Sequence, residues 1–242
     1  TFNYHLNGFF VGGSVIKNKL FYFINGEKEI LNSAATSFIA SDAQHFPGGN
    51  VSAANADTLN TLRQFLINHY GYDPGVYQGY SYRTEKDRFS VKIDWNINSK
   101  NTFAFKYTYS GSNKENPVAN TGAPGGRQPG ITGLPFNGTG SLSKIYFSIF
   151  IAELNTRFSN KISNKMQIGY VSLRNSRSSL AVKEFPFVDI LNGQGQSYTA
   201  FGYEPLSYNN LLYTNVYQVI DIFTIYKGSH EINLGTQNYL KS

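Results

Sequence analysis

The sequence predicts an all-β fold, an antiparallel up-and-down segment of a transmembrane β-barrel, and three observations lead to this prediction. Tight turns alternate with long loops, strand-length stretches alternate apolar with polar residues, and aromatic residues make up 16% of the 242 residues. In an up-and-down meander, every second connection lies on the same side of the sheet. All tight turns would therefore lie on one rim and all long loops on the other, as in barrels with short periplasmic turns and long extracellular loops.

The tight turns each combine Asn or Gly with Lys, and we expect them at residues 16–19, 98–101, 162–165 and 226–230. The stretches between the turns and the long loops predict about eight strands by their apolar pattern. Their expected positions are residues 2–7, 20–30, 88–97, 102–109, 143–158, 165–174, 211–226 and 231–239.

The strand expected at residues 88–97 has the clearest pattern, and residues 102–109 repeat it. One face carries only the apolar residues Phe89, Val91, Ile93, Trp95 and Ile97, and the other carries Arg, Ser, Lys, Asp and Asn. A soluble sandwich would give the same alternation. The charged opposite face, and a length near the roughly 10 residues that cross a bilayer at a tilt, favour a barrel with its apolar face outward.

Two other strands are less regular. Dense aromatic residues at 20–24 follow a tight turn and predict a girdle at the membrane boundary. Between residues 143 and 158 the apolar residues change parity after Ile151, which predicts a β-bulge near Ala152 and Glu153 that restores the phase.

The long loops contain one stretch with helical spacing, from Ser52 to Tyr70, with Ser52 as the expected N-cap and Gly71 just beyond the C-terminus. We expect this short amphipathic helix to be the only organised element in the loops. The other two loops, residues 113–140 and 180–210, are rich in Gly and Pro. Loops of this length are usually lids, binding loops or disordered segments.

Several function classes find no support in the composition. No stretch reaches the roughly 18 apolar residues of a membrane-spanning helix, so membrane insertion would require a barrel. The four His are scattered, Cys is absent, and no HExxH or CxxC spacing occurs, so we expect no catalytic residues, metal site or cofactor. The net charge of +6 is spread over turns and polar faces, which argues against nucleic acid as a partner. Glu27 and Glu29 share a strand face, which we interpret as a solvated rim.

Three passages resemble TonB-dependent outer-membrane receptors, particularly the Oar-like receptors of Bacteroidota. Residues 12–23, GGSVIKNKLFYF, are similar to the "GGPIIKNKLFFF" passage early in that family's barrel, with Ser14 where Pro is usual. Residues 70–75 and 87–97 resemble its loop helix and the following strand. Residues 221–232 resemble its "DNLTYYKGKHTLTFG" hairpin.

The resemblance implies a bacterial outer-membrane protein for TonB-energised uptake of an extracellular ligand. Its partners would be outer-membrane lipid and, through a missing N-terminal region, TonB and the inner-membrane motor. Residues 1–242 would be one part of a barrel of about 22 strands, from near its second strand to near its ninth, without the plug domain and the remaining strands. Both ends of the chain also look cut, so we expect a piece of a longer protein.

Loop aromatic and charged residues are the candidate ligand contacts, because rings and a bidentate Arg can engage a peptide, glycan or chelate. They are Tyr72, Asp73, Tyr77, Tyr80, Arg127, Tyr198 and Tyr203. The alternative is that they pack the loops or lie in the membrane interface. Two other functions stay open at this point: a passive outer-membrane porin or surface adhesin, and a soluble β-barrel ligand carrier.

Overall fold

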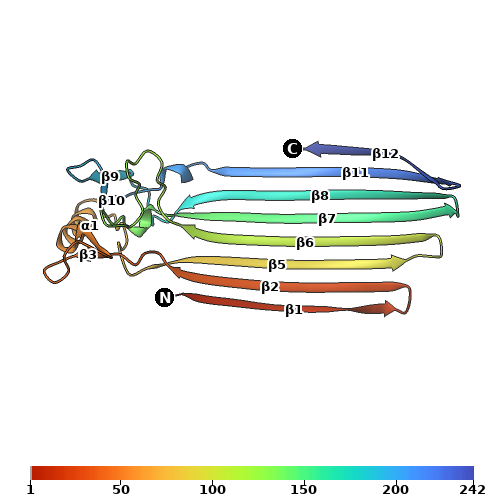
Figure 1. The fold of residues 1–242 in the computed structure, drawn as a ribbon, viewed down its shortest axis with the longest axis horizontal. Helices are drawn as coiled ribbons and strands as arrows, with labels where there is room; N and C mark the ends of the chain where they lie inside the picture. Colours follow the sequence, from red (N-terminus) through yellow and green to blue (C-terminus); the bar gives the residue numbers. More distant parts are fainter. Residues whose placement is uncertain (1) are drawn as a thin grey trace.

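A long antiparallel sheet with a folded cap at one end makes up the computed structural model, which describes residues 2–242 (Figure 1). Eight strands form the sheet in the order β1-β2-β5-β6-β7-β8-β11-β12. They are β1 (Asn3–Ile16), β2 (Leu20–Ala34), β5 (Ser81–Asn96), β6 (Asn101–Asn116), β7 (Ser141–Ser159), β8 (Ile162–Ser179), β11 (Leu211–Lys227) and β12 (His230–Lys241). Each pairs antiparallel with the next, which confirms the predicted up-and-down topology.

Three of the four tight turns lie where the sequence predicts them. Asn18 has φ 59° and Gly228 has φ 64°, and the Asn98 side-chain oxygen accepts hydrogen bonds from the backbone N–H groups of Lys100 (2.9 Å) and Asn101 (3.0 Å). The turn predicted at residues 162–165 is wrong, because the chain turns at residues 160–161. An Asn-Lys pair occurs at both places, and the earlier one lets Ile162 pair with Ile225 on β11.

The strands are longer than the sequence suggests, with 12 to 19 residues each. At about 3.3 Å per residue, a 16-residue strand such as β5 spans roughly 50 Å. Even at a tilt of about 45° this exceeds a hydrocarbon core of about 30 Å. On β5 the apolar row ends at Phe89, and Arg83, Glu85 and Asp87 continue the same face toward the cap.

The face that carries Val91, Ile93 and Trp95, here called the apolar face, is continuous across neighbouring strands. Backbone pairing aligns Val91 with a row of aromatic residues on the next strands, namely Tyr107, Phe150, Tyr170 and Tyr217. The ring centroids of Tyr107 and Phe150 are 4.5 Å apart and those of Tyr170 and Tyr217 are 4.9 Å apart. This row runs across the sheet as a girdle would.

The girdle predicted at residues 20–24 is divided between the two faces. Tyr22 pairs with Ile93 on the apolar face, whereas Phe21 pairs with Asp94 and Phe23 with Lys92 on the opposite, polar face.

The polar face carries ion pairs between neighbouring strands. Glu29 pairs with Lys86 (2.8 Å), Glu27 with Arg88 (3.2 Å) and Glu153 with Lys165 (2.8 Å). The shared face of Glu27 and Glu29 therefore has cationic partners on β5 opposite it.

The bulge predicted near Ala152 and Glu153 is wrong. β7 pairs without interruption with β6 from Ser141 to Thr156, and its one irregularity toward β8 lies between Arg157 and Ser159. Because the register continues, the odd-numbered apolar residues from Ile145 to Ile151 lie on the polar face, while Phe150 between them stays on the apolar face. The odd-numbered residues join apolar residues of β8 and β11 in a polar-face apolar patch of Ile145, Phe147, Ile149, Ile151, Val171, Leu173 and Val216.

The loop cap consists of residues 35–80, 117–140 and 180–210, and it gathers at the end of the sheet opposite the tight turns (Figure 1). It contains α1 (Ala56–Tyr70), the parallel pair β3 (Ile39–Ser41) and β4 (Val51–Asn55), the antiparallel pair β9 (Val188–Leu191) and β10 (Ser197–Phe201), and two short 3₁₀ turns. The expectation that the helix is the only organised element of the loops is therefore wrong.

Helix α1 begins three residues later than predicted, because Asn55 and not Ser52 is its N-cap. The Asn55 side-chain oxygen accepts a hydrogen bond from the Thr58 N–H (3.1 Å), while Ser52 belongs to β4. Gly71 ends the helix as predicted, with φ 59° and its N–H bonded to the Ile67 carbonyl. Among residues 2–242, no helix has the length and apolar content needed to cross a membrane.

Candidate binding site in the loop cap

The loop cap has a hydrophobic core of its own. Nine buried residues from all three loops form it, namely Ala40, Ala54, Leu59, Leu66, Tyr72, Tyr77, Leu134, Phe136 and Phe201. Because every loop contributes side chains to the same core, the three loops fold as one unit. A surface on this cap is therefore held in a fixed shape.

Backbone hydrogen bonds also join the three loops. Leu134 and Phe136 donate to the carbonyls of Tyr198 (3.0 Å) and Ala200 (2.9 Å), which adds the second loop to the hairpin of the third. Asn137 donates to the Val76 carbonyl of the first loop (2.8 Å).

One glycine permits the close packing of the third loop on itself. Gly202 has φ 104°, and a Cβ at this position would overlap the Pro186 carbonyl oxygen. No other residue type fits both the backbone angle and the space.

A buried ion pair fastens the cap to the sheet. Arg177 of β8 donates two hydrogen bonds to the fully buried Glu204 of the third loop, at 3.0 and 3.2 Å. The Ser207 hydroxyl also donates to Glu204, and the Glu204 N–H donates to the Ser179 hydroxyl (3.0 Å). The carboxylate is thus satisfied on several sides, as a buried charge must be.

Among the predicted site residues, Tyr72 lies in the cap core. Its hydroxyl accepts a hydrogen bond from the Gly202 N–H (3.0 Å), and its ring stacks on Phe185 at 4.3 Å between centroids. Burial raises the pKa of the Tyr72 hydroxyl.

Tyr77 and Tyr198 also hold elements of the cap together. The Tyr77 hydroxyl donates to the Asn60 side chain of α1 (3.1 Å), and burial raises its pKa. The Tyr198 hydroxyl accepts from the N–H of Asn55, the N-cap residue of α1 (2.7 Å).

Both charged candidates have partners inside the cap. Asp73 accepts two hydrogen bonds from Arg63, at 2.9 and 2.8 Å, and these bonds hold the pKa of its carboxyl below the ordinary value. Arg127 pairs with Asp189 (2.7 Å), donates to the carbonyls of Ala119 and Thr121, and lies over the Phe187 ring.

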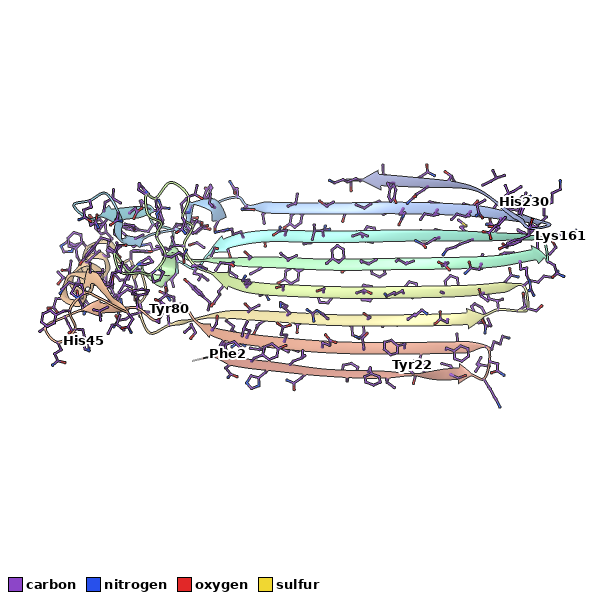
Figure 2. The ribbon with its side chains drawn as sticks, in the orientation of Figure 1. Phe2, Tyr22, His45, Tyr80, Lys161 and His230 are labelled. Atoms are coloured by element: carbon purple, nitrogen blue, oxygen red, sulfur yellow. The ribbon has the colours of Figure 1, made fainter. Side chains whose placement is uncertain are left out.

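Tyr80 lies where the cap meets the sheet, while His45 lies at the far tip of the cap and Lys161 and His230 at the opposite end of the molecule (Figure 2). The Tyr80 ring meets the Tyr82 ring edge-on, at 5.5 Å between centroids. Burial raises the pKa of the Tyr80 hydroxyl. Tyr80 therefore lies at the junction of the cap and the sheet and not on the outer surface of the cap (Figure 2).

Tyr203, another predicted site residue, lines a surface pocket in the cap. This pocket has a volume of about 340 Å³ and is lined by Glu184, Phe185, Pro186, Tyr203 and Tyr208. The structure thus separates Tyr203 from the other six candidates and brings it together with four residues that the sequence analysis did not select. The run Glu184-Phe185-Pro186, an aromatic residue between a charge and a proline, was the available signal.

Comparison with known proteins gives a family match and two structural likenesses. The model of the family described as "Outer membrane beta barrel domain" matches residues 41–241. The chain is similar in fold to a mutant of the ferric enterobactin receptor PfeA from Pseudomonas aeruginosa, with 11% identity and a TM-score of 0.46 over 98% of this chain. It is also similar to the outer membrane transporter YddB from Escherichia coli, with 8% identity and a TM-score of 0.37 over 99% of this chain. The chain spans 28% and 34% of the lengths of these two proteins. No curated protein matches the sequence.

Proposed function

Because this chain belongs to the outer membrane β-barrel family, we propose that it forms part of the wall and the ligand-binding loops of a receptor for TonB-energised uptake. The observation that carries the proposal is the folding of three long loops into one cap at a single end of the sheet. Long loops with a rigid core are typical of binding surfaces held by a barrel scaffold. The three passages that resemble those of Oar-like receptors support the same function.

The contacts inside the cap divide the candidate ligand residues into two groups. Tyr72, Tyr77 and Tyr198 donate or accept hydrogen bonds within the cap, so their proposed role is to hold the ligand-binding surface in shape. Asp73 and Arg127 are engaged by other side chains and have the same proposed role. We propose Tyr203 as the ligand contact, and Tyr80 as a contact for a ligand that passes from the cap to the lumen.

The two faces of the sheet support a proposed orientation in the membrane. The apolar face presents exposed rings and aliphatic side chains, such as Trp95 at 41% and Ile168 at 50% exposure, and would lie against lipid. The polar face with its ion pairs would line the lumen.

Trp95 fluorescence tests this orientation in the full-length receptor, reconstituted in bilayers whose acyl chains carry bromine. We expect strong quenching, because the indole lies on the lipid side near the tight turns. A folded receptor without quenching would place Trp95 in a protein core and contradict the proposed wall.

Solute flux distinguishes an energised receptor from a passive porin. TonB coupling would require a plug domain and a TonB box outside residues 1–242. We therefore expect liposomes that contain the full-length protein to exclude small sugars, and cellular uptake to stop when a protonophore collapses the proton gradient. Free passage of sugars through the reconstituted protein would instead favour the passive porin, and ligand capture without uptake would favour an adhesin.

A further inference from the structure

The residues that line the cap pocket beside Tyr203 favour a positively charged ligand over a negatively charged one. Three aromatic side chains, one proline and one carboxylate line it, and no lining residue is basic. The faces of aromatic rings carry partial negative charge, and Glu184 adds a formal one. The pocket therefore disfavours anions and offers a cation attractive groups of two kinds.

Two of the three aromatic walls, Phe185 and Tyr203, are held in place by the rest of the cap. Phe185 stacks on the buried Tyr72 at 4.3 Å with an interplanar angle of 11°, so its ring is fixed from behind. Tyr203 and Tyr208 lie at 79° to each other, with centroids 6.4 Å apart. The Tyr203 N–H donates to the Phe185 carbonyl (2.9 Å), which ties two of the walls together. A pocket that is already formed loses little order when a ligand enters.

We propose that this pocket binds an organic cation, an alkylammonium or guanidinium group, by cation–π contact with the aromatic rings and charge pairing with Glu184. Aromatic side chains recognise ammonium groups in this way. The volume of about 340 Å³ is at the lower end of ligand pockets, which suits one cationic group with a short carbon frame. The inference rests on the proposed function, because it names the ligand chemistry of the receptor's outer surface.

Two sources can supply this chemistry: a free quaternary amine, or a Lys or Arg side chain of a peptide. The probes are choline, its neutral isostere 3,3-dimethyl-1-butanol, and N-acetyl-arginine amide. Binding to the full-length receptor in detergent is measured by ligand-observed NMR. We expect at least one cation to bind about fivefold or more tightly than the neutral isostere. Choline and the arginine derivative then distinguish the two sources.

Four variants test the residues. Glu184→Gln removes the charge and Tyr203→Leu removes a ring, and each should weaken cation binding about two- to fivefold. Tyr203→Phe keeps the ring and should bind as the unchanged receptor does. Lys183→Ala is the matched control, because Lys183 precedes Glu184 in the chain but does not line the pocket; it should not weaken binding.

Equal affinity for choline and its neutral isostere would overturn the proposal, as would the absence of cation binding to a folded receptor. A loss of binding in Tyr203→Phe together with retention in Glu184→Gln would also overturn it, because a hydroxyl and not the charge would then be recognised. Amide exchange of the cap shows that each variant is folded. Trp95 quenching and sugar exclusion do not depend on the pocket, so failure of this inference is distinguishable from failure of the proposed function.

Discussion

At the scale of single residues, the ion pair between Arg177 and Glu204 places a fully buried carboxylate at the attachment of the cap to the sheet. Glu204 has no exposed side-chain surface, and Arg177 has 26%. Removing one partner of a buried pair leaves a charge without compensation, which costs more than replacing both. The attachment of cap to sheet therefore depends on both residues being present together.

Arg177→Met should destabilise the cap by about 3–5 kcal/mol, because Glu204 would remain buried and unpaired. Hydrogen exchange of the amides of residues 197–210 measures this change in the full-length protein. The double variant Arg177→Met with Glu204→Gln is the control, and it should recover part of the lost protection. If single and double variants exchange equally fast, the unpaired charge is not the cause.

The Arg63 and Asp73 pair predicts a dependence on pH. Arg63 lowers the pKa of Asp73 below its ordinary value of 3.8, so the folded state favours the ionised carboxylate. The stabilisation is present above that value and is lost as the pH falls through the lower folded pKa. Both side chains are about one-third or more exposed, so the effect is modest.

Cap amide exchange should therefore become faster as the pH falls from about 5 to about 3, after correction for the intrinsic exchange rate. Asp73→Asn should remove most of this pH dependence near α1. Asp42→Asn is the matched control: contacts with Gln44 and His45 also lower the pKa of Asp42, but this carboxyl lies at the exposed tip of the cap. An unchanged pH response in Asp73→Asn would show that this pair does not stabilise the cap.

At the scale of elements, successive side chains of each strand point alternately to the apolar face and to the polar face of the sheet. On β8, Ile168 lies on the apolar face and pairs with Val219, while Gln167 lies on the polar face and pairs with Ile220. A change at one position and the same change at its neighbour therefore report on opposite sides of the wall.

Ile168→Lys should destabilise the membrane-inserted protein by about 2–4 kcal/mol, because on the proposed orientation it places a charge against hydrocarbon. Gln167→Lys places the same charge beside the lumen and should change stability by less than about 0.5 kcal/mol. Unfolding in urea from bilayers measures both. Equal effects of the two variants would contradict the assignment of the faces.

The regular strands could be predicted from the sequence, and the irregular ones only in part. On β5 and β6 the apolar residues keep one parity, so strand, face and partner all follow from the pattern. On β7, the apolar residues Ile145, Phe147, Ile149 and Ile151 follow the opposite parity, and a bulge was the simplest local explanation. The structure keeps the register and places these residues on the polar face. Pairing with the neighbouring strands β6 and β8 fixes the register of β7, and the sequence pattern of β7 alone carries no information about that pairing.

At the scale of the whole molecule, the cap is the part that the sequence could not predict. The helix inside the first loop is predicted by apolar spacing within its own segment. The contacts that join the three loops connect residues far apart in the sequence and leave no such local pattern. Tyr72 and Gly202 are bonded across 130 positions of the chain, and Asn55 and Tyr198 across 143. The predicted ligand contacts therefore include residues that pack inside the cap, such as Tyr72 and Tyr77, as well as Tyr203 at its surface pocket. Residue type alone does not distinguish a buried aromatic side chain from an exposed one.

One shared core predicts that the cap opens as a single cooperative unit. Leu59 on α1 is fully buried within that core, and Leu59→Ala should cost the cap about 2–5 kcal/mol. Because residues of all three loops pack around the same core, amide exchange should become faster together in residues 51–70, 131–140 and 197–203. The amides of β5 to β8 within the apolar face should keep their protection. Gln64→Ala, at an exposed position of the same helix, should leave all three loops unchanged. Faster exchange confined to α1 would mean that the loops open independently, and the cap would then be three separate loops and not the rigid surface on which the proposed ligand site depends.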